Sequence, residues 1–286
     1  MPRLVTTARC LIWDQGLGQP PMGKPSTQTV HFRYAVFMTE DLARHYDTHF
    51  YSAYGDRSRQ SAAVVVPIVN NLVQPESVLD VGCGVGSWLA EWIGQGLTDV
   101  LGLDGEYVNR AALQVETSRF RALDLRHGFS LGRTFGLVQS LEVAEHLDES
   151  CADAFVESLT RHADTVLFSA AIPGQRGFHH VNEQWPSYWT AKFAAAGFKV
   201  FDVIRPQIWI DRRIDIWYRQ NILLFSRALS FDARNVYLDI VHPEIWEQRL
   251  DSSTFSLREL AKGIPGAAAS AVRWYGGRAA AKFGSR

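Results

Sequence analysis

The stretch Ser77-Val-Leu-Asp-Val-Gly-Cys-Gly-Val-Gly-Ser87 decides the fold. It begins with a short apolar run and then carries glycines at the alternate positions 82, 84 and 86. The helix-forming stretch Trp88–Ile93 follows directly. A strand, a glycine turn and a helix in this order predict one unit of an open α/β sheet. Ligands of such sheets bind beyond the carboxyl ends of the strands, where glycine lets the backbone approach a ligand closely.

The spacing of the glycines narrows the choice of ligand. The dinucleotide fingerprint is Gly-x-Gly-x-x-Gly, whereas here the three glycines alternate and Asp80 stands two positions before the first. This pattern resembles motif I of the class I S-adenosylmethionine (SAM) methyltransferases. The resemblance implies a SAM site with the turn beneath the methionine part of the cofactor. Its residues would be Asp80, Gly82, Cys83, Gly84 and Gly86.

The composition limits the class of protein and its partners. The chain has 286 residues, 47% of them hydrophobic and 21% charged, which suits one soluble domain with appendages. Its net charge of −1 argues against nucleic acid or an anionic membrane as partner. The 3 cysteines are scattered, which suggests neither a disulfide framework nor a zinc site and fits a cytoplasmic location. Without a long apolar run, no transmembrane helix is expected.

The chain outside the motif suggests four parts. Residues 1–37 are interrupted by prolines and glycines, so we expect a disordered or loosely attached extension. Residues 38–227 would form the methyltransferase domain, beginning with one helical stretch up to Tyr54 and a second from Arg57 to Val73. Residues 228–262 form a helical appendage that packs on the domain or on a second subunit of a homodimer. The small-residue, basic tail 263–286 is expected to be disordered.

Two further predicted strands end in acids. Val100–Leu103 is followed by Asp104, and a carboxylate there can accept from both hydroxyls of a ribose. The stretch from Phe120 ends in Asp124 and Leu125, a position that lies near the adenine in the family resembled. For both aspartates the alternative is a plain turn residue.

The fourth predicted strand, Phe135–Ser140, leads into Leu141-Glu-Val-Ala-Glu-His-Leu147. If this is helical, Glu142, Glu145 and His146 share one face and could hold a divalent metal or supply acid/base groups. The stretch resembles the Glu-x-x-Glu-His of the ubiquinone-biosynthesis O-methyltransferases, in the type 11 methyltransferase group, and of the small-RNA 2′-O-methyltransferases. That resemblance implies a Mg²⁺-type ion near the substrate hydroxyl. Ser140 and Leu141, just before Glu142, are expected at the SAM site. The alternative for Glu142, Glu145 and His146 is an exposed polar first turn whose acids favour the helix dipole.

The fifth predicted strand, Thr165–Ser169, leads into a loop dense in polar residues. His180 is expected as the general base or as a further metal ligand, and His146 is the other candidate base. Four residues of the loop are expected at the substrate: His179, Asn182, Glu183 and Trp185. The alternative is a surface loop with a chance histidine pair.

Two more strands are predicted, at Phe198–Ile204 and Trp217–Phe225. The whole then forms an α/β, Rossmann-like, doubly wound seven-stranded sheet with an antiparallel last strand and helices on both faces. The resemblance implies SAM-dependent O-methylation of a hydroxyl on a small molecule or sugar, assisted by Mg²⁺ or another divalent metal. The alternatives are an RNA 2′-O-methyltransferase, which would need a basic channel, and a non-catalytic SAM-binding scaffold.

Overall fold

A computed structural model describes residues 48–231 and 238–250 of the chain. By its internal contacts the chain divides into Met1–Leu42 and Ala43–Arg286, and all described residues belong to the second unit. The expected extension 1–37 and the expected tail 263–286 lie outside the described residues, as does part of the appendage. None of the helices in the described part combines the length and apolarity needed to cross a bilayer.

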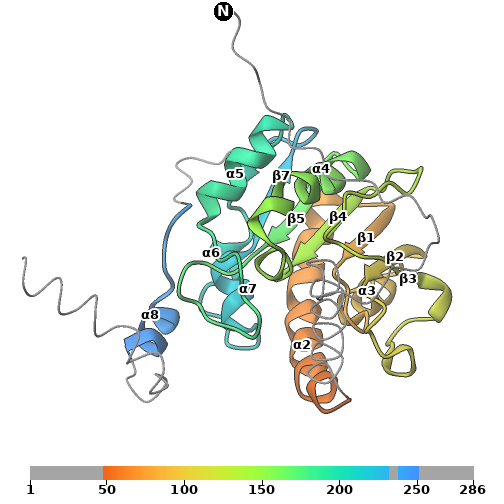
Figure 1. The fold of residues 1–286 in the computed structure, drawn as a ribbon, viewed down its shortest axis with the longest axis horizontal. Helices are drawn as coiled ribbons and strands as arrows, with labels where there is room; N and C mark the ends of the chain where they lie inside the picture. Colours follow the sequence, from red (N-terminus) through yellow and green to blue (C-terminus); the bar gives the residue numbers. More distant parts are fainter. Residues whose placement is uncertain (1–47, 232–237, 251–286) are drawn as a thin grey trace, which may run out of the picture. The chain divides into compact units, whose positions relative to one another are not determined.

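The described residues build a seven-stranded sheet in the order β3-β2-β1-β4-β5-β7-β6 (Figure 1). β7 runs antiparallel to both β5 and β6, and the other neighbouring strands pair in parallel. This confirms the predicted α/β fold with an antiparallel last strand. The strands are β1 (Ser77–Val81), β2 (Asp99–Asp104), β3 (Phe120–Ala122), β4 (Leu137–Leu141), β5 (Thr165–Ser169), β6 (Lys199–Phe201) and β7 (Leu223–Ser226).

Helices and short 3₁₀ turns connect the strands. The predicted helical stretch before Tyr54 and the one from Arg57 are continuous from Thr48 onward, as one helix. The helices are α2 (Thr48–Val73), α3 (Ser87–Gly94), α4 (Ala152–His162), α5 (Pro186–Ala195), α6 (Arg205–Ile208), α7 (Ile216–Asn221) and α8 (Pro243–Leu250). The 3₁₀ turns are η1 (Arg110–Ala112), η2 (Thr117–Arg119), η3 (Ala144–His146) and η4 (Glu149–Cys151).

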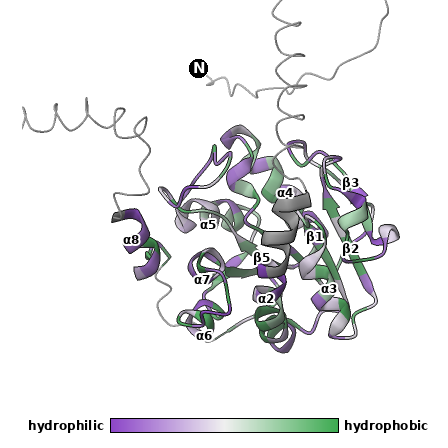
Figure 2. Cartoon of the chain, turned by 90° about the horizontal axis from the view of Figure 1, so that it is seen from below, coloured by the Kyte–Doolittle hydropathy of each residue, from purple (hydrophilic) through white to green (hydrophobic). Residues whose placement is uncertain are grey.

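Two hydrophobic cores lie on the two faces of the sheet. Side chains of a strand alternate between its faces, and in β1 Val78 packs in one core while Leu79 and Val81 pack in the other. The first core includes residues of α2 and α3, and the second includes residues of α4 and α5. Helices therefore cover both faces, and Figure 2 shows the green, hydrophobic strands between them.

The seventh predicted strand is wrong in its first half, where Ile216–Asn221 forms the helix α7. Aromatic residues favoured a strand there, but three consecutive buried polar side chains find partners on elements distant in sequence. Arg219 binds Glu244, Gln220 Nε2 donates to the Ile240 carbonyl, and Asn221 binds Glu142. These contacts, which no local pattern reports, outweigh the strand propensity.

The sixth predicted strand is also too long, because only Lys199–Phe201 pairs in the sheet. Asp202 instead accepts from the guanidinium of Arg205 at 2.9 and 2.7 Å, at the start of α6. Arg205 is buried and also donates to the carbonyls of Gln220 and Leu238. One arginine thus joins β6, α6, α7 and the segment before α8.

Replacing Arg205 by leucine should destabilise the fold strongly. The change leaves a mostly buried carboxylate and two carbonyls without their donor, a loss of about 3–5 kcal/mol in the free energy of unfolding. Urea unfolding of the full chain measures it. The matched control is Arg213→Leu, which removes an exposed bidentate pair with Asp211 and should shift the midpoint little. Equal midpoints for the two variants would contradict the role assigned to Arg205.

Candidate functional site

The glycine turn after β1 is held by backbone hydrogen bonds. The amides of Gly82 and Cys83 both donate to the Leu103 carbonyl, at 2.7 and 3.1 Å, and Gly86 N donates to Cys83 O at 2.9 Å. Gly82, Gly84 and Gly86 all have positive φ, between 53° and 85°. Because other residues rarely adopt this conformation, the three glycines are required by the backbone itself.

The turn lies against the segment that follows β4. A Cβ on Gly82 would overlap the Val143 side chain, so this side chain packs on the Gly82 backbone more closely than any other residue at 82 would allow. β1 and β4 are parallel neighbours, and their carboxyl ends therefore meet at one edge of the sheet. This edge, with the turn on one side and Glu142–His146 on the other, is the candidate site.

Asp104 stands at the end of β2, beneath the turn. Its carboxylate accepts from Gly84 N at 2.7 Å, Gly105 N at 2.6 Å and the Tyr107 hydroxyl at 2.5 Å. Burial raises its pKa, and these three donors oppose the rise. A carboxylate has about four lone-pair positions, so about one remains for a ligand hydroxyl. Tyr107, which the sequence analysis missed, comes only three positions after the acid.

Asp80, in β1, is the second buried acid at this edge. Burial raises its pKa from 3.8 to about 7, with the Asp104 charge adding to the rise and the Gln139 side chain opposing it. Its Oδ2 has no hydrogen-bond partner among the described residues. Nor does a basic side chain of the described residues form an ion pair with Asp80 or Asp104, so this edge carries uncompensated negative character.

The other expected cofactor residues lie nearby. Asp124 follows β3, where Leu123 N donates to the Asp104 carbonyl at 2.7 Å, and Arg126 binds its carboxylate. The Arg126 hydrogen bond lowers the pKa of Asp124. Leu125 is buried in the second core. Ser140 and Leu141 form the end of β4, and the Ser140 hydroxyl is buried without a partner among the described residues.

Opposite the turn, Glu145, His146 and His180 come together. One potential ligand atom from each lies within 4.8 Å of those of the other two. The two imidazole rings are 4.9 Å apart, edge to face. Glu145 is fully buried, and neither of its carboxylate oxygens completes a hydrogen bond with a described residue. We call these three residues the Glu-His-His cluster.

The loop after β5 is fastened to this cluster by backbone hydrogen bonds. Val181 N and Asn182 N both donate to the Glu145 carbonyl, at 2.9 and 3.0 Å. His180 Nδ1 lies 3.0 Å from Glu183 Oε1, and its ring packs on Gly177, where a Cβ would overlap Nε2. Glu183 is itself fixed, because it accepts from Gly174 N at 2.6 Å and Arg176 N at 2.8 Å.

Burial shifts the pKa values of Glu145 and His146 in the cluster. Burial, and then the Glu142 charge, raise the pKa of Glu145 well above its usual range. The amides of Glu145 and Ala171 oppose this rise without completing a hydrogen bond of normal geometry. Burial, and then His180, lower the pKa of His146 to about 4, so this imidazole is neutral at neutral pH. A bound cation would reverse the rise at Glu145, because it favours the ionised carboxylate.

Glu142 is not on a shared helical face, which corrects the sequence prediction. Its φ of 56° is left-handed, and the 3₁₀ turn begins only at Ala144. Its carboxylate accepts from Gln175 Nε2 at 3.0 Å and from Asn221 Nδ2 at 3.0 and 3.2 Å. Glu142 thus lies outside the three-residue cluster and fixes its surroundings. Gln175 and Asn221 were not foreseen, because they meet Glu142 only in the folded chain.

The remaining loop residues take different positions. The His179 ring lies edge to face with that of Phe178, at 4.2 Å, and its backbone φ is positive. Asn182 is buried, with its Oδ1 accepting from Gln184 and its Nδ2 without a partner among the described residues. Trp185 is 38% exposed and lines a cavity beside α8.

Comparison with solved structures finds likenesses at low sequence identity. The chain resembles Streptomyces venezuelae DesVI at 18% identity and a TM-score of 0.45, over 63% of this chain and 95% of that one. It resembles the methyltransferase domain of bacterial CtHen1 at 18% identity and a TM-score of 0.44, over 58% of this chain and 98% of that one. It resembles magnesium protoporphyrin IX methyltransferase (ChlM) from Synechocystis PCC 6803 at 19% identity and a TM-score of 0.49, over 70% of this chain and 100% of that one.

No protein-family model matches the chain, and a search of curated proteins found no similar sequence. Because the TM-scores lie below 0.5, the function has to be inferred from the residues of the site.

Asp80 should make stability depend on pH. The raised pKa means that the folded state favours the protonated acid, so this contribution is complete below pH 3.8 and is lost as the pH rises toward 7. Asp80→Asn removes the titration. Its free energy of unfolding, relative to the natural chain, should therefore rise by about 2–3 kcal/mol between pH 5 and pH 8.5. Urea unfolding at both pH values measures the difference, and a pH-independent difference would contradict the burial of Asp80.

Proposed function

We propose that the protein is a SAM-dependent methyltransferase that methylates a hydroxyl of a small molecule or sugar. The observation that carries the proposal is the contact between the two halves of the site. The glycine turn follows β1, and the segment that carries Glu145 and His146 follows the adjacent strand β4; the two segments touch at Gly82 and Val143. A methyl group held over the turn would therefore lie close to a hydroxyl held at the cluster, as in-line transfer requires.

The charge of the site favours SAM over a dinucleotide. Asp80 and Asp104 are both buried at the turn, and Asp80 has an oxygen without a partner among the described residues. Two acids would repel an anionic pyrophosphate, whereas SAM carries a sulfonium and an ammonium group that they attract. In this proposal Gly82, Cys83, Gly84 and Gly86 form the floor, and Asp104 supplies an acceptor to the ribose.

The cluster fits a divalent cation. A buried carboxylate whose oxygens lack partners among the described residues, beside two imidazoles, is a donor set that a metal would complete. Two nitrogens and one carboxylate suit Mn²⁺ or another transition ion better than Mg²⁺. Glu145, His146 and His180 would hold the ion, with Glu142 beside them. When bound, such an ion lowers the pKa of a nearby hydroxyl.

The chain must also remove the proton of the acceptor. We assign this task to His180: Glu183 lies 3.0 Å from its Nδ1 and would stabilise the imidazolium that forms. His180 Nε2 can either accept a proton or ligate a metal, and the two roles exclude one another. His146, whose pKa is about 4, is the weaker base.

SAM should bind and stabilise the folded chain, whereas NAD⁺ at the same concentration should not. A saturating ligand at 100 times its Kd adds about 2.7 kcal/mol to the free energy of unfolding. At pH 8.5, where Asp80 is ionised, Asp80→Asn should weaken SAM binding by about tenfold or more, because it removes a buried charge that attracts the cationic ligand. Thermal shift and calorimetry measure both effects. No shift with millimolar SAM would end the cofactor proposal.

The metal can be tested without any acceptor. One Mn²⁺ per chain should bind, detected by electron paramagnetic resonance, and Glu145→Gln should weaken binding by about 10-fold or more. Glu142→Gln, which changes the neighbouring acid, should retain the ion. If the Glu145 variant binds Mn²⁺ as the natural chain does, Glu145 is not a ligand.

The rate of methyl transfer with and without a chelator decides whether His180 acts as the general base or as a metal ligand. Methyl transfer from labelled SAM to catechols, hydroxy acids and sugars should stop with EDTA and return with Mn²⁺ if His180 ligates. If turnover is insensitive to EDTA, and His180→Ala lowers it by about 10²–10⁴-fold at unchanged SAM affinity, His180 is the base.

A further inference from the structure

A cavity lies between the loop after β5 and α8. Its volume is about 280 Å³. Small-molecule sites begin at about 300 Å³, so this one suits a small acceptor rather than a polymer. Most of its lining is apolar, with Trp185 and Trp246 exposed at its walls and Ile172 and Ile245 buried. We call it the Trp185/Trp246 pocket.

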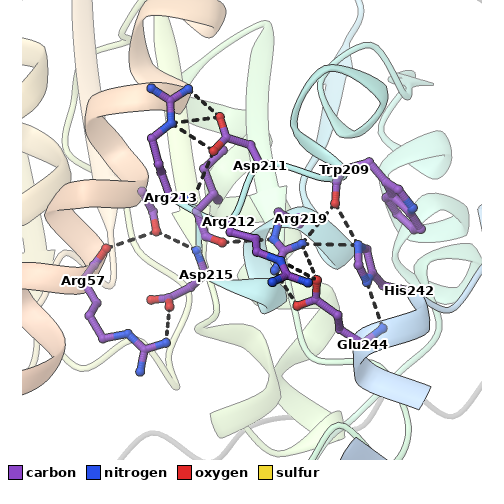
Figure 3. Close-up of polar contacts among 11 residues, drawn as sticks. Arg57, Trp209, Asp211, Arg212, Arg213, Asp215, Arg219, His242 and Glu244 are labelled. Carbon is purple, nitrogen blue, oxygen red and sulfur yellow. Dashed lines mark hydrogen bonds and ion pairs between the residues drawn. The ribbon is translucent and has the colours of Figure 1, made fainter. Parts of the chain in front are cut away.

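The α8 wall of the pocket is anchored to the domain. The buried guanidinium of Arg219, from α7, binds both oxygens of Glu244 at 3.2 and 2.8 Å (Figure 3). Just before α8, His242 Nε2 lies 2.7 Å from the Trp209 carbonyl, and His242 N donates to Gln220 at 2.5 Å. These contacts hold the first turn of α8, so the residues that follow face the cavity from a fixed support.

The pocket is joined to the Glu-His-His cluster through one carboxylate. Gly174, which lines the pocket, donates its N–H to Glu183, and the same carboxylate contacts His180. A molecule in the pocket therefore lies along the segment that supports the cluster.

Among the described residues that line the pocket, Arg249 is the charged one. Its Nη1 donates to the Pro173 carbonyl at 3.1 Å, and it packs on Gly174 where a Cβ would collide with the guanidinium. No acid among residues 57–231 and 238–249 forms an ion pair with it. About four of its five N–H donors have no partner among the described residues, in a planar fork that matches a carboxylate or phosphate.

We propose that the Trp185/Trp246 pocket binds the apolar body of the methyl acceptor and that Arg249 binds an anionic group on it. The acceptor class is then an aromatic or alicyclic hydroxy acid rather than a neutral sugar. The role of this ligand as methyl acceptor rests on the proposed methyl transfer. Its binding to the pocket does not depend on that proposal. Two indole walls supply apolar contact, and the guanidinium supplies the charge-assisted hydrogen bonds.

The test uses two probes with the full chain in the absence of SAM. 6-Hydroxy-2-naphthoate carries a hydroxyl and a carboxylate on opposite ends of one aromatic body, and 2-naphthol lacks the carboxylate. Titrations followed by probe fluorescence give both affinities. The naphthoate should bind about tenfold more tightly than the naphthol. Arg249→Gln should remove this preference and leave the naphthol affinity unchanged.

Two further variants complete the design. Trp246→Ala should weaken both probes about equally, since it removes a wall and no charge, and its circular dichroism should match that of the natural chain. Arg213→Gln is the charge control, because Arg213 is exposed and bound to Asp211 away from the pocket lining. It should leave both affinities unchanged.

The inference is overturned if neither probe binds at millimolar concentration, or if Arg249→Gln keeps the preference for the naphthoate. It is also overturned if Arg213→Gln loses the preference equally, since the effect is then one of net charge. If SAM gives no thermal shift while the probes behave as expected, the methyltransferase proposal fails and a hydroxy-acid site remains. If SAM binds and the probe pattern is absent, only the pocket inference falls.

Discussion

The close approach of Gly82 to Val143 is the contact on which the site depends. It brings the turn after β1 against the segment after β4, with no room for a side chain between them. The positive φ values of the turn and the two amides that share the Leu103 carbonyl keep the backbone in this position. Everything proposed for the chemistry needs a cofactor and an acceptor to meet, and this contact fixes where they can do so.

The second constraint is the electrostatic cost of the cluster. A buried acceptor without a hydrogen bond costs about 1–3 kcal/mol, and Glu145 has two such oxygens among the described contacts. The fold nevertheless holds the carboxylate in place, because Val181 and Asn182 bind the carbonyl of the same residue. Glu142, by contrast, is satisfied by Asn221 and Gln175. Two neighbouring acids of the sequence thus have opposite characters, and only the unsatisfied one lies in the cluster.

Much of this architecture could be predicted from local patterns. The glycine turn, β5 and α5 fall where apolar runs, glycine and the helix-starting Pro186 place them. The errors occur where distant partners decide. Arg219, Gln220 and Asn221 form part of a helix because Glu244, Ile240 and Glu142 meet them there. The carboxylate of Glu142, whose φ is left-handed, is bound by Asn221 of α7 and Gln175 of the loop after β5, so no spacing rule could have revealed its position.

The anchoring of α8 has a consequence for how the protein could change over time. The helix is held through Glu244 in its first turn, whereas Trp246 and Arg249 occupy later positions. The side-chain contacts that hold the first turn, made by Glu244 and His242, involve neither Trp246 nor Arg249. Substitutions in the later turns would alter the shape and charge of the cavity while the attachment, the sheet and the cluster stayed intact. The fold thus separates the residues that would select the ligand from those that would carry out the chemistry. Ligand preference can diverge under selection while the chemistry is retained.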